Sequence, residues 1–284
     1  MTPSAATVIA VIALDAVAGL VLVLAAIALR RLLFAGRHAG DRNVAESLVA
    51  AADLVAIFLV VASALAGCVA GQDLLADAGW TALFGGTAVV LLTLTGRFAT
   101  RLVLGARLHA EIERGNVAAG IAAAGHWLAA GLVVSSCVSG RDLGTFGVAL
   151  LFFALAQVTL HLFVMAFRAL TVYGDREEIL GENVAAALSY AGVTVALGVV
   201  IGHAADGVFL GLEASLRGYA LSLAGSLILY PVRQLVVGAI LAGGGLILRG
   251  GRLDAGIARE RNVGLGVLEG AAYLAAALAW ARLT

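Results

Sequence analysis

The sequence contains little charge. Acidic and basic residues make up 13% of its 284 residues and hydrophobic residues 62%, with a mean hydropathy of +1.04. A soluble domain is typically about a quarter charged and about half apolar, so this composition excludes an ordinary soluble globular protein. The apolar runs exceed the roughly 20 residues that cross a bilayer, which predicts an integral membrane protein. The formal net charge is +0, so the charge balance indicates no nucleic-acid partner.

The sequence also lacks lysine and the common catalytic motifs. All 18 basic residues are Arg, as a GC-rich genome would produce. There is no Gly-x-Ser-x-Gly, no His-Glu-x-x-His and no phosphate loop, and the five His residues show no metal-ligand spacing. We therefore expect no enzymatic activity, no cofactor and no metal site.

The apolar runs predict eight transmembrane helices. They cover roughly residues 5–34, 44–69, 76–106, 116–137, 144–172, 183–204, 217–248 and 262–282. Helices are expected because an open chain in lipid must pair every backbone N–H and C=O internally. The first run lacks the basic start of a signal peptide and contains Asp15, so we expect it to be retained as a span. The predicted fold class is an all-α polytopic membrane protein.

The connections between these helices differ in charge. The links after helices 1, 3, 5 and 7 are long and hold thirteen of the eighteen Arg residues, whereas the other links are shorter and mostly acidic. Positively charged loops stay in the cytoplasm. The sequence therefore predicts that the Arg-rich links are cytoplasmic and that both termini are extracytoplasmic.

The dipeptide Asn-Val recurs at the start of every second helix. Asn43, Asn116, Asn183 and Asn262 lie 73, 67 and 79 residues apart, each where an Arg-rich link enters a helix. Asn is a favoured N-cap because its side chain accepts a hydrogen bond from the first turn. The Ala/Gly-rich sequence that follows lets helices approach closely. We interpret the four residues as the helix caps of a repeat.

Each Asn-Val helix completes a repeat of two helices. A unit of two spans returns the chain to its starting side, so the four units are parallel, about an axis normal to the membrane. Units 1 and 2 occupy residues 1–140, and units 3 and 4 occupy residues 141–284. "CVAGQDLL" from Cys68 matches "CVSGRDLG" from Cys137. These cysteines either form a disulfide on the oxidising outer face or pack as two buried thiols.

The pattern acid-x-x-x-Asn-Val-Ala before Ala/Gly-rich sequence is clearest in "EIERGNVAAGIAAAG" and "REEILGENVAAALSYAG". It resembles the YjfL-like bacterial inner-membrane proteins, catalogued as domain of unknown function 350. The resemblance spans essentially the whole chain, and since typical members look like four-span proteins, the chain resembles a tandem fusion of two. The resemblance implies the bacterial inner membrane, an association with membrane-stress genes and no agreed activity. Unit 4 departs from the pattern with Gly264 where the family prefers Ala.

Ionisable and hydroxyl side chains recur on one face of the Asn-Val helices. Counted from each Asn, positions 3, 7 and 10 share a helical face. Position 10 lies about 15 Å deep, near the bilayer centre. Polar groups at such depth are costly and usually face the bundle interior. We expect an intramembrane polar path, or alternatively a set of interhelical hydrogen bonds, formed by Glu46, Asp53, His126, Tyr190 and Glu269.

The other helices also carry polar side chains within apolar sequence, namely Asp15, Gln157, His161, Arg233 and Gln234. Pro231 should kink the seventh helix beside Arg233. A buried Arg must be paired. We expect a buried ion pair between Asp15 and Arg233, with Asp53 and Glu269 as alternative partners.

These features favour a transport function, because deep Asp, Glu and His residues are the usual parts of proton relays. The prediction is a channel-like or proton-coupled conduit for a small ion. The alternative is a non-transporting scaffold or lipid-binding protein in the membrane-stress response, whose Arg-rich links bind anionic headgroups of membrane lipids. A homo-oligomer is compatible with both. An enzyme acting on lipid is disfavoured because no nucleophile–base pair is visible.

Overall fold

The computed structural model describes residues 17–28, 42–70, 73–245, 247 and 249–284. Its long helices are α2 (Val44–Cys68), α3 (Leu74–Leu104), α5 (Val117–Ser136), α6 (Leu143–Arg168), α8 (Val184–Ala205), a composite helix (Leu212–Leu241) and α12 (Val263–Leu283). Three short link helices lie between them: α4 (Leu108–Arg114), α7 (Asp175–Leu180) and α11 (Arg252–Ala258). The composite helix consists of α9 (Leu212–Leu223), η2 (Ala224–Ile228), α10 (Leu229–Val232) and η3 (Arg233–Leu241).

Seven of these helices are long and apolar enough to cross a membrane. The chain is therefore a helical, multi-pass membrane protein. The seven correspond to seven of the eight helices expected from the sequence. The first expected helix, residues 5–34, falls mostly outside the described residues, and its described part, Val17–Ala28, is a shorter apolar helix. The eighth span stays a prediction.

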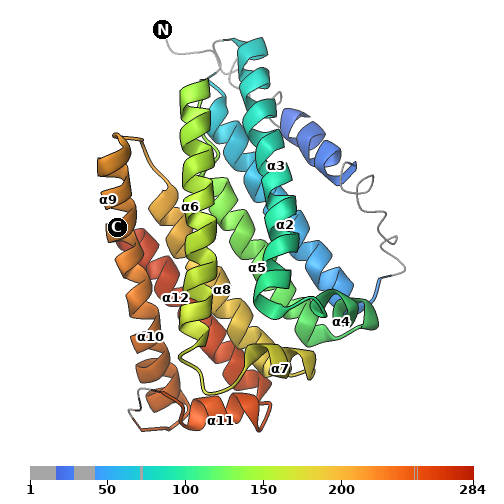
Figure 1. Cartoon of the computed structure of the whole chain (residues 1–284), viewed down its shortest axis with the longest axis vertical. Coiled ribbons are helices and arrows are strands. Elements are labelled where there is room, and N and C mark those ends of the chain that lie inside the picture. Colours follow the sequence, from blue (N-terminus) through green and yellow to red (C-terminus); the bar gives the residue numbers. More distant parts are fainter. Residues whose placement is uncertain (1–16, 29–41, 71–72, 246, 248) are drawn as a thin grey trace, which may run out of the picture.

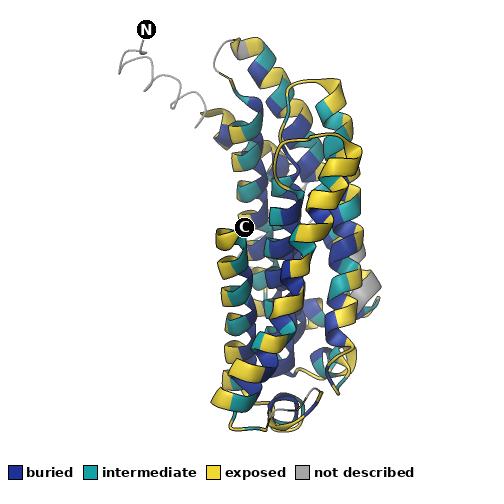
Figure 2. Cartoon of the chain, turned by 90° about the vertical axis from the view of Figure 1, so that its left-hand side faces the viewer, coloured by how far each residue is buried: buried dark blue, intermediate teal, exposed yellow. Residues whose placement is uncertain are grey.

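The long helices form two layers (Figure 1). One layer is a row in which α2 packs against α5, α5 against α8, and α8 against α12. The second layer contains α3, α6 and the composite helix. In it, α3 contacts α2 and α5, α6 contacts α5 and α8, and the composite helix contacts α8 and α12. Buried residues lie where helices face one another, and the outward sides are largely exposed (Figure 2).

The same small-residue contacts recur along the row. Positions are counted from the repeat Asn of each row helix. Position 2 of one row helix lies against position 4 of the next row helix, and position 13 lies against position 15 of the next row helix. A Cβ added to Gly131 would lie 2.5 Å from the Cβ of Ala56, so a larger residue would force the helices apart. The recurring pairs are Ala45–Gly120, Ala56–Gly131, Ala129–Gly198 and Ala185–Gly266.

The three link helices lie at the same end of the molecule (Figure 1). Each ends shortly before an Asn-Val dipeptide. The residue directly before the Asn has a left-handed backbone in all three cases, with φ of 97° at Gly115, 64° at Glu182 and 51° at Arg261. In the sequence these segments appear only as polar links, because helices of six or seven residues are too short to show a clear periodic pattern.

The composite helix changes its hydrogen-bonding pattern near Pro231. The sequence predicts a helix over 217–248 with a kink, and in the structure the helix runs over Leu212–Leu241. It begins as an α-helix, continues as the 3-10 helix η2 and the short α-helix α10, and ends as the π-helix η3. Proline has no N–H to donate to the helical ladder. π-helical turns frequently occur at functional sites. Here the π-helix begins at Arg233, whose side chain is fully buried.

The two cysteines are free thiols, and both are buried. The loop after Cys137 touches the end of α2 beside Cys68, since the Gly140 N–H donates to the Gly67 carbonyl over 3.3 Å. Burial raises the pKa of Cys137 to about 12, so its thiol is a poor nucleophile. Of the two alternatives for Cys68 and Cys137, the structure therefore has the buried thiols.

Candidate functional site: buried polar and ionic clusters

Each Asn of the repeat caps its own helix, and three of them also hold the next unit. The side-chain oxygen accepts a hydrogen bond from the first turn of its own helix. The side-chain NH₂ group donates to a carbonyl near the end of the next link helix over 2.9–3.0 Å. An Asp cap could not donate this second bond. The cross-unit bonds join Asn43 to Ile112, Asn116 to Ile179 and Asn183 to Ile257.

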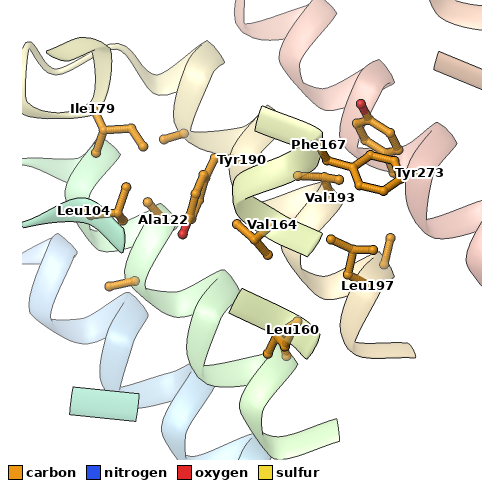
Figure 3. Close-up of a cluster of buried hydrophobic side chains, with 14 of the residues drawn as sticks. Leu104, Ala122, Leu160, Val164, Phe167, Ile179, Tyr190, Val193, Leu197 and Tyr273 are labelled. Atoms are coloured by element: carbon orange, nitrogen blue, oxygen red, sulfur yellow. The ribbon is translucent and has the colours of Figure 1, made fainter. Parts of the chain in front are cut away.

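The five residues of the expected polar path lie in different surroundings. Glu46 accepts a hydrogen bond from the backbone N–H of its own helix cap, and Asp53 is half-buried on α2. Tyr190 is fully buried in an apolar cluster beside Ala122 (Figure 3). The structure thus gives Glu46 a capping role rather than a place inside the bundle.

Two cavities among the described residues contain none of the five path residues. One lies against α3, α5 and α6, and the other lies between the helix Val17–Ala28, α2 and α3. Both are lined almost entirely by apolar side chains. Neither forms a polar route through the row.

Glu269 belongs to a buried ion pair with Arg233. The Arg233 Nε donates to Glu269 Oε1 over 2.5 Å, and the Arg233 Nη2 pairs with Asp254 of α11. All three side chains are fully buried. Asp15, the expected partner of Arg233, lies outside the described residues. Within the described residues, Arg233 pairs with Glu269, one of the alternative partners expected from the sequence, and with Asp254.

A second arginine lies close to this group. Arg168, at the end of α6, pairs with Asp175 of α7 and donates to Ser189 Oγ over 2.8 Å and to the Tyr173 hydroxyl over 3.0 Å. Burial raises the pKa of Asp175, and the Arg168 guanidinium opposes that rise. The backbone N–H of Val172 donates to Asp254 Oδ2 over 3.1 Å and so joins the two groups.

We call Arg168, Asp175, Arg233, Asp254 and Glu269 the ionic network. It holds three carboxyl groups but only two guanidinium groups; Arg233, Asp254 and Glu269 are fully buried, Arg168 is buried, and Asp175 is half-buried on link helix α7. Within it, Arg233 Nη1 and Glu269 Oε2 have no hydrogen-bond partner. A buried carboxylate oxygen without a partner is costly, so the network is suited to take up a proton or a small cation.

Sequence reasoning missed three members of the ionic network. Arg168, Asp175 and Asp254 were read as parts of polar links. A signal was present, because Asp175 and Asp254 each lie eight residues before the Asn of their unit. The repeat therefore places both aspartates at the same position of a link helix.

His126 lies on α5 in a second polar cluster. It is fully buried, and its ring lies 5.3 Å from the ring of His161 on α6, measured between centroids. Neither nitrogen of His126 has a hydrogen-bond partner. His126 is therefore not hydrogen-bonded to the ionic network.

A model of one protein family matches almost the whole chain. The family is described as Domain of Unknown Function (DUF350), and its model matches residues 3–138 and again residues 142–283. No curated protein and no solved structure matches the chain. The two matched segments divide the chain between units 2 and 3.

Proposed function

The chain belongs to the DUF350 family, whose domain it carries twice in tandem, and we propose that it is a proton-coupled conduit for a small ion. In this proposal the ionic network is the element that binds the ion. The membrane is the bacterial inner membrane, the Arg-rich links face the cytoplasm, and the four units are parallel about an axis normal to the membrane.

The observation that carries the proposal is the excess carboxyl group in the network. Ionised side chains within membrane helices are rare and usually mark ion pathways or proton relays, and Arg233 and Glu269 lie on helices that can cross a membrane. Glu269 and Asp254 both bind the guanidinium group of Arg233, and the Oε2 atom of Glu269 has no hydrogen-bond partner. A proton or a monovalent cation on this oxygen would neutralise the excess charge. Loading and release at Glu269 is then the step coupled to transport.

The experiment compares two Glu→Gln variants of the full chain in liposomes. Glu269→Gln removes the titratable group but keeps an oxygen that can accept from Arg233. Glu46→Gln is the matched control, since Glu46 also lies on an Asn-Val helix but serves its cap. We expect proton or cation flux to fall at least tenfold in Glu269→Gln and to stay near the wild-type value in Glu46→Gln.

Folded wild-type protein that gives no more flux than protein-free liposomes would overturn the conduit. Equal flux in both variants would remove Glu269 from the mechanism. Each variant is checked for folded protein by circular dichroism and size-exclusion chromatography before reconstitution.

The second candidate is a membrane scaffold that binds anionic lipids through its Arg-rich links. Close contacts such as Gly131–Ala56 favour it, because they leave no pore between the row helices. A scaffold should show no flux in any variant. It should bind liposomes that contain anionic lipid, and Arg→Gln changes in the links should weaken that binding.

A further inference from the structure

The cluster around His126 contains an unusual number of buried polar atoms without partners. They are both ring nitrogens of His126, the Nε2 of His161, and both side-chain amide atoms of Gln157. Buried polar groups in proteins are nearly always hydrogen-bonded, and a group of exceptions calls for a water or an ion. Five such atoms on two neighbouring helices could therefore be satisfied together by one bound ligand.

The orientation of His161 fixes which nitrogen is available. Its Nδ1 lies 2.5 Å from the backbone carbonyl oxygen of Gln157, one turn earlier on α6. A carbonyl only accepts, so Nδ1 carries the proton and Nε2 presents a bare lone pair. A histidine held through one N–H by a backbone carbonyl is the usual arrangement of a metal ligand. Gln157 shares this face of α6 and adds an amide oxygen.

The separation of the two rings fits a shared ligand. Two imidazoles on one tetrahedral Zn²⁺, with Zn–N bonds of about 2.0–2.1 Å, place their ring centroids about 5.2 Å apart. The centroids of His126 and His161 are 5.3 Å apart, with the rings tilted by 56°. No hydrogen bond joins the two rings. The ring separation therefore matches that of two imidazoles bound to one ion.

We propose that His126, His161 and the Gln157 amide oxygen form an intramembrane site for a divalent transition-metal ion such as Zn²⁺ or Co²⁺. Imidazole ligands suit Zn, Cu, Ni and Co, whereas Mg²⁺ and Ca²⁺ require a shell of oxygen ligands. Each of the three residues stands out in the sequence as a polar side chain in an apolar helix, but their pairing is not visible there because His126 and His161 lie on two helices, 35 residues apart. The site uses none of the ionic network and is independent of the proposed function.

The test measures metal binding by the purified full chain in detergent after removal of metal with a chelator. Zn²⁺ and Co²⁺ are added separately, and bound metal is quantified after dialysis. We expect one ion per chain, with intense Co²⁺ visible absorption typical of four-coordinate geometry. His126→Leu and His161→Leu should weaken binding by more than about 100-fold, and Gln157→Leu less. His203→Leu is the control, because His203 lies near the end of α8, on neither of the two helices that hold the site, and contacts Thr284.

The leucine variants should fold, which keeps the test decisive. Replacing a buried polar group without partners by an apolar one of similar size is near neutral or stabilising. Metal-free His126→Leu should therefore melt at or above the wild-type temperature. Added Zn²⁺ should raise the melting temperature of the wild type and His203→Leu only. Retained binding in both His126→Leu and His161→Leu, or no ion bound by the wild type, would overturn the site and leave only buried water.

Discussion

Link helix α4 in the first half of the chain and link helices α7 and α11 in the second half hold the same place in the repeat but bury different side chains. Eight residues before its Asn, α4 buries Leu108, whereas α7 and α11 place Asp175 and Asp254 there. Arg168, which pairs with Asp175, also has an equivalent in the first half. This is Arg101, which lies seven residues before Leu108 and is exposed.

The comparison separates the framework of the repeat from its charged interior. In the described residues both halves have Asn caps that also donate to a link helix, and both have an Ala–Gly contact at positions 2 and 4 of neighbouring row helices. The buried leucine of α4 shows that a link helix docks without an ion pair. The ionic network is therefore not required by the framework, which is why we connect it with function.

The largest expected effect on the free energy of unfolding comes from replacing Asp175 of the second half by leucine, the residue at the equivalent position 108 of the first half. Asp175→Leu leaves the buried Arg168 without its carboxylate partner, which should lower the free energy of unfolding by about 3–5 kcal/mol. The double variant Arg168→Leu/Asp175→Leu removes both charges and should recover most of this loss. Chemical unfolding in detergent micelles measures both. A single variant as stable as the wild type would show that the network adds no constraint.

A smaller loss of stability is expected when Asn116, which joins the two halves of the chain, is replaced by Asp. The same change at Asn262, at the end of the row, should cost less. Asn116→Asp keeps the cap of α5 but loses the donor to the Ile179 carbonyl of α7. The Ile179 carbonyl keeps the hydrogen bond that it accepts from the Glu182 N–H, so the variant loses one cross-unit hydrogen bond, at a cost of about 0.5–1.5 kcal/mol. Asn262→Asp is the control, since the exposed Asn262 caps only α12 in the described residues. Equal losses in thermal unfolding would mean that capping alone explains the repeat.

The smallest expected effect concerns the left-handed residue before the Asn. The first half uses Gly115 there, and unit 4 uses Arg261 with φ of 51°. The left-handed conformation costs a residue with a Cβ roughly 1–2 kcal/mol relative to glycine. Glycine in turn loses more conformational entropy on folding, which offsets part of this difference. Arg261→Gly should therefore stabilise the protein by about 0.5–1 kcal/mol, while Gly115→Ala should destabilise it. A lower melting temperature for Arg261→Gly would contradict this reasoning.

The elements that the sequence predicted well are those set by local chemistry. A bilayer requires long apolar helices, and an Asn before such a helix caps it whatever lies nearby, so the seven long helices and the four caps follow from the chain alone. The short helices α4, α7 and α11 do not, because six or seven residues give no reliable periodicity. The capping bond of Glu46 with the Asn43 N–H also depends on the helix start, which the sequence analysis placed correctly without predicting that bond.

The partners of the buried charged and polar groups were decided by the tertiary structure. Arg233 meets Glu269 and Asp254 because the π-helix, α11 and α12 converge, and His126 meets His161 because α6 packs over α5. These contacts join residues 21 to 36 positions apart. The sequence by itself placed Arg233, Glu269, His126 and His161 in apolar helices, where a polar group must find a partner, whereas Asp254 lies in a polar link. Which partner it finds depends on how the row and the second layer pack, because the pairing energy acts only between side chains that packing has already brought within a few ångströms.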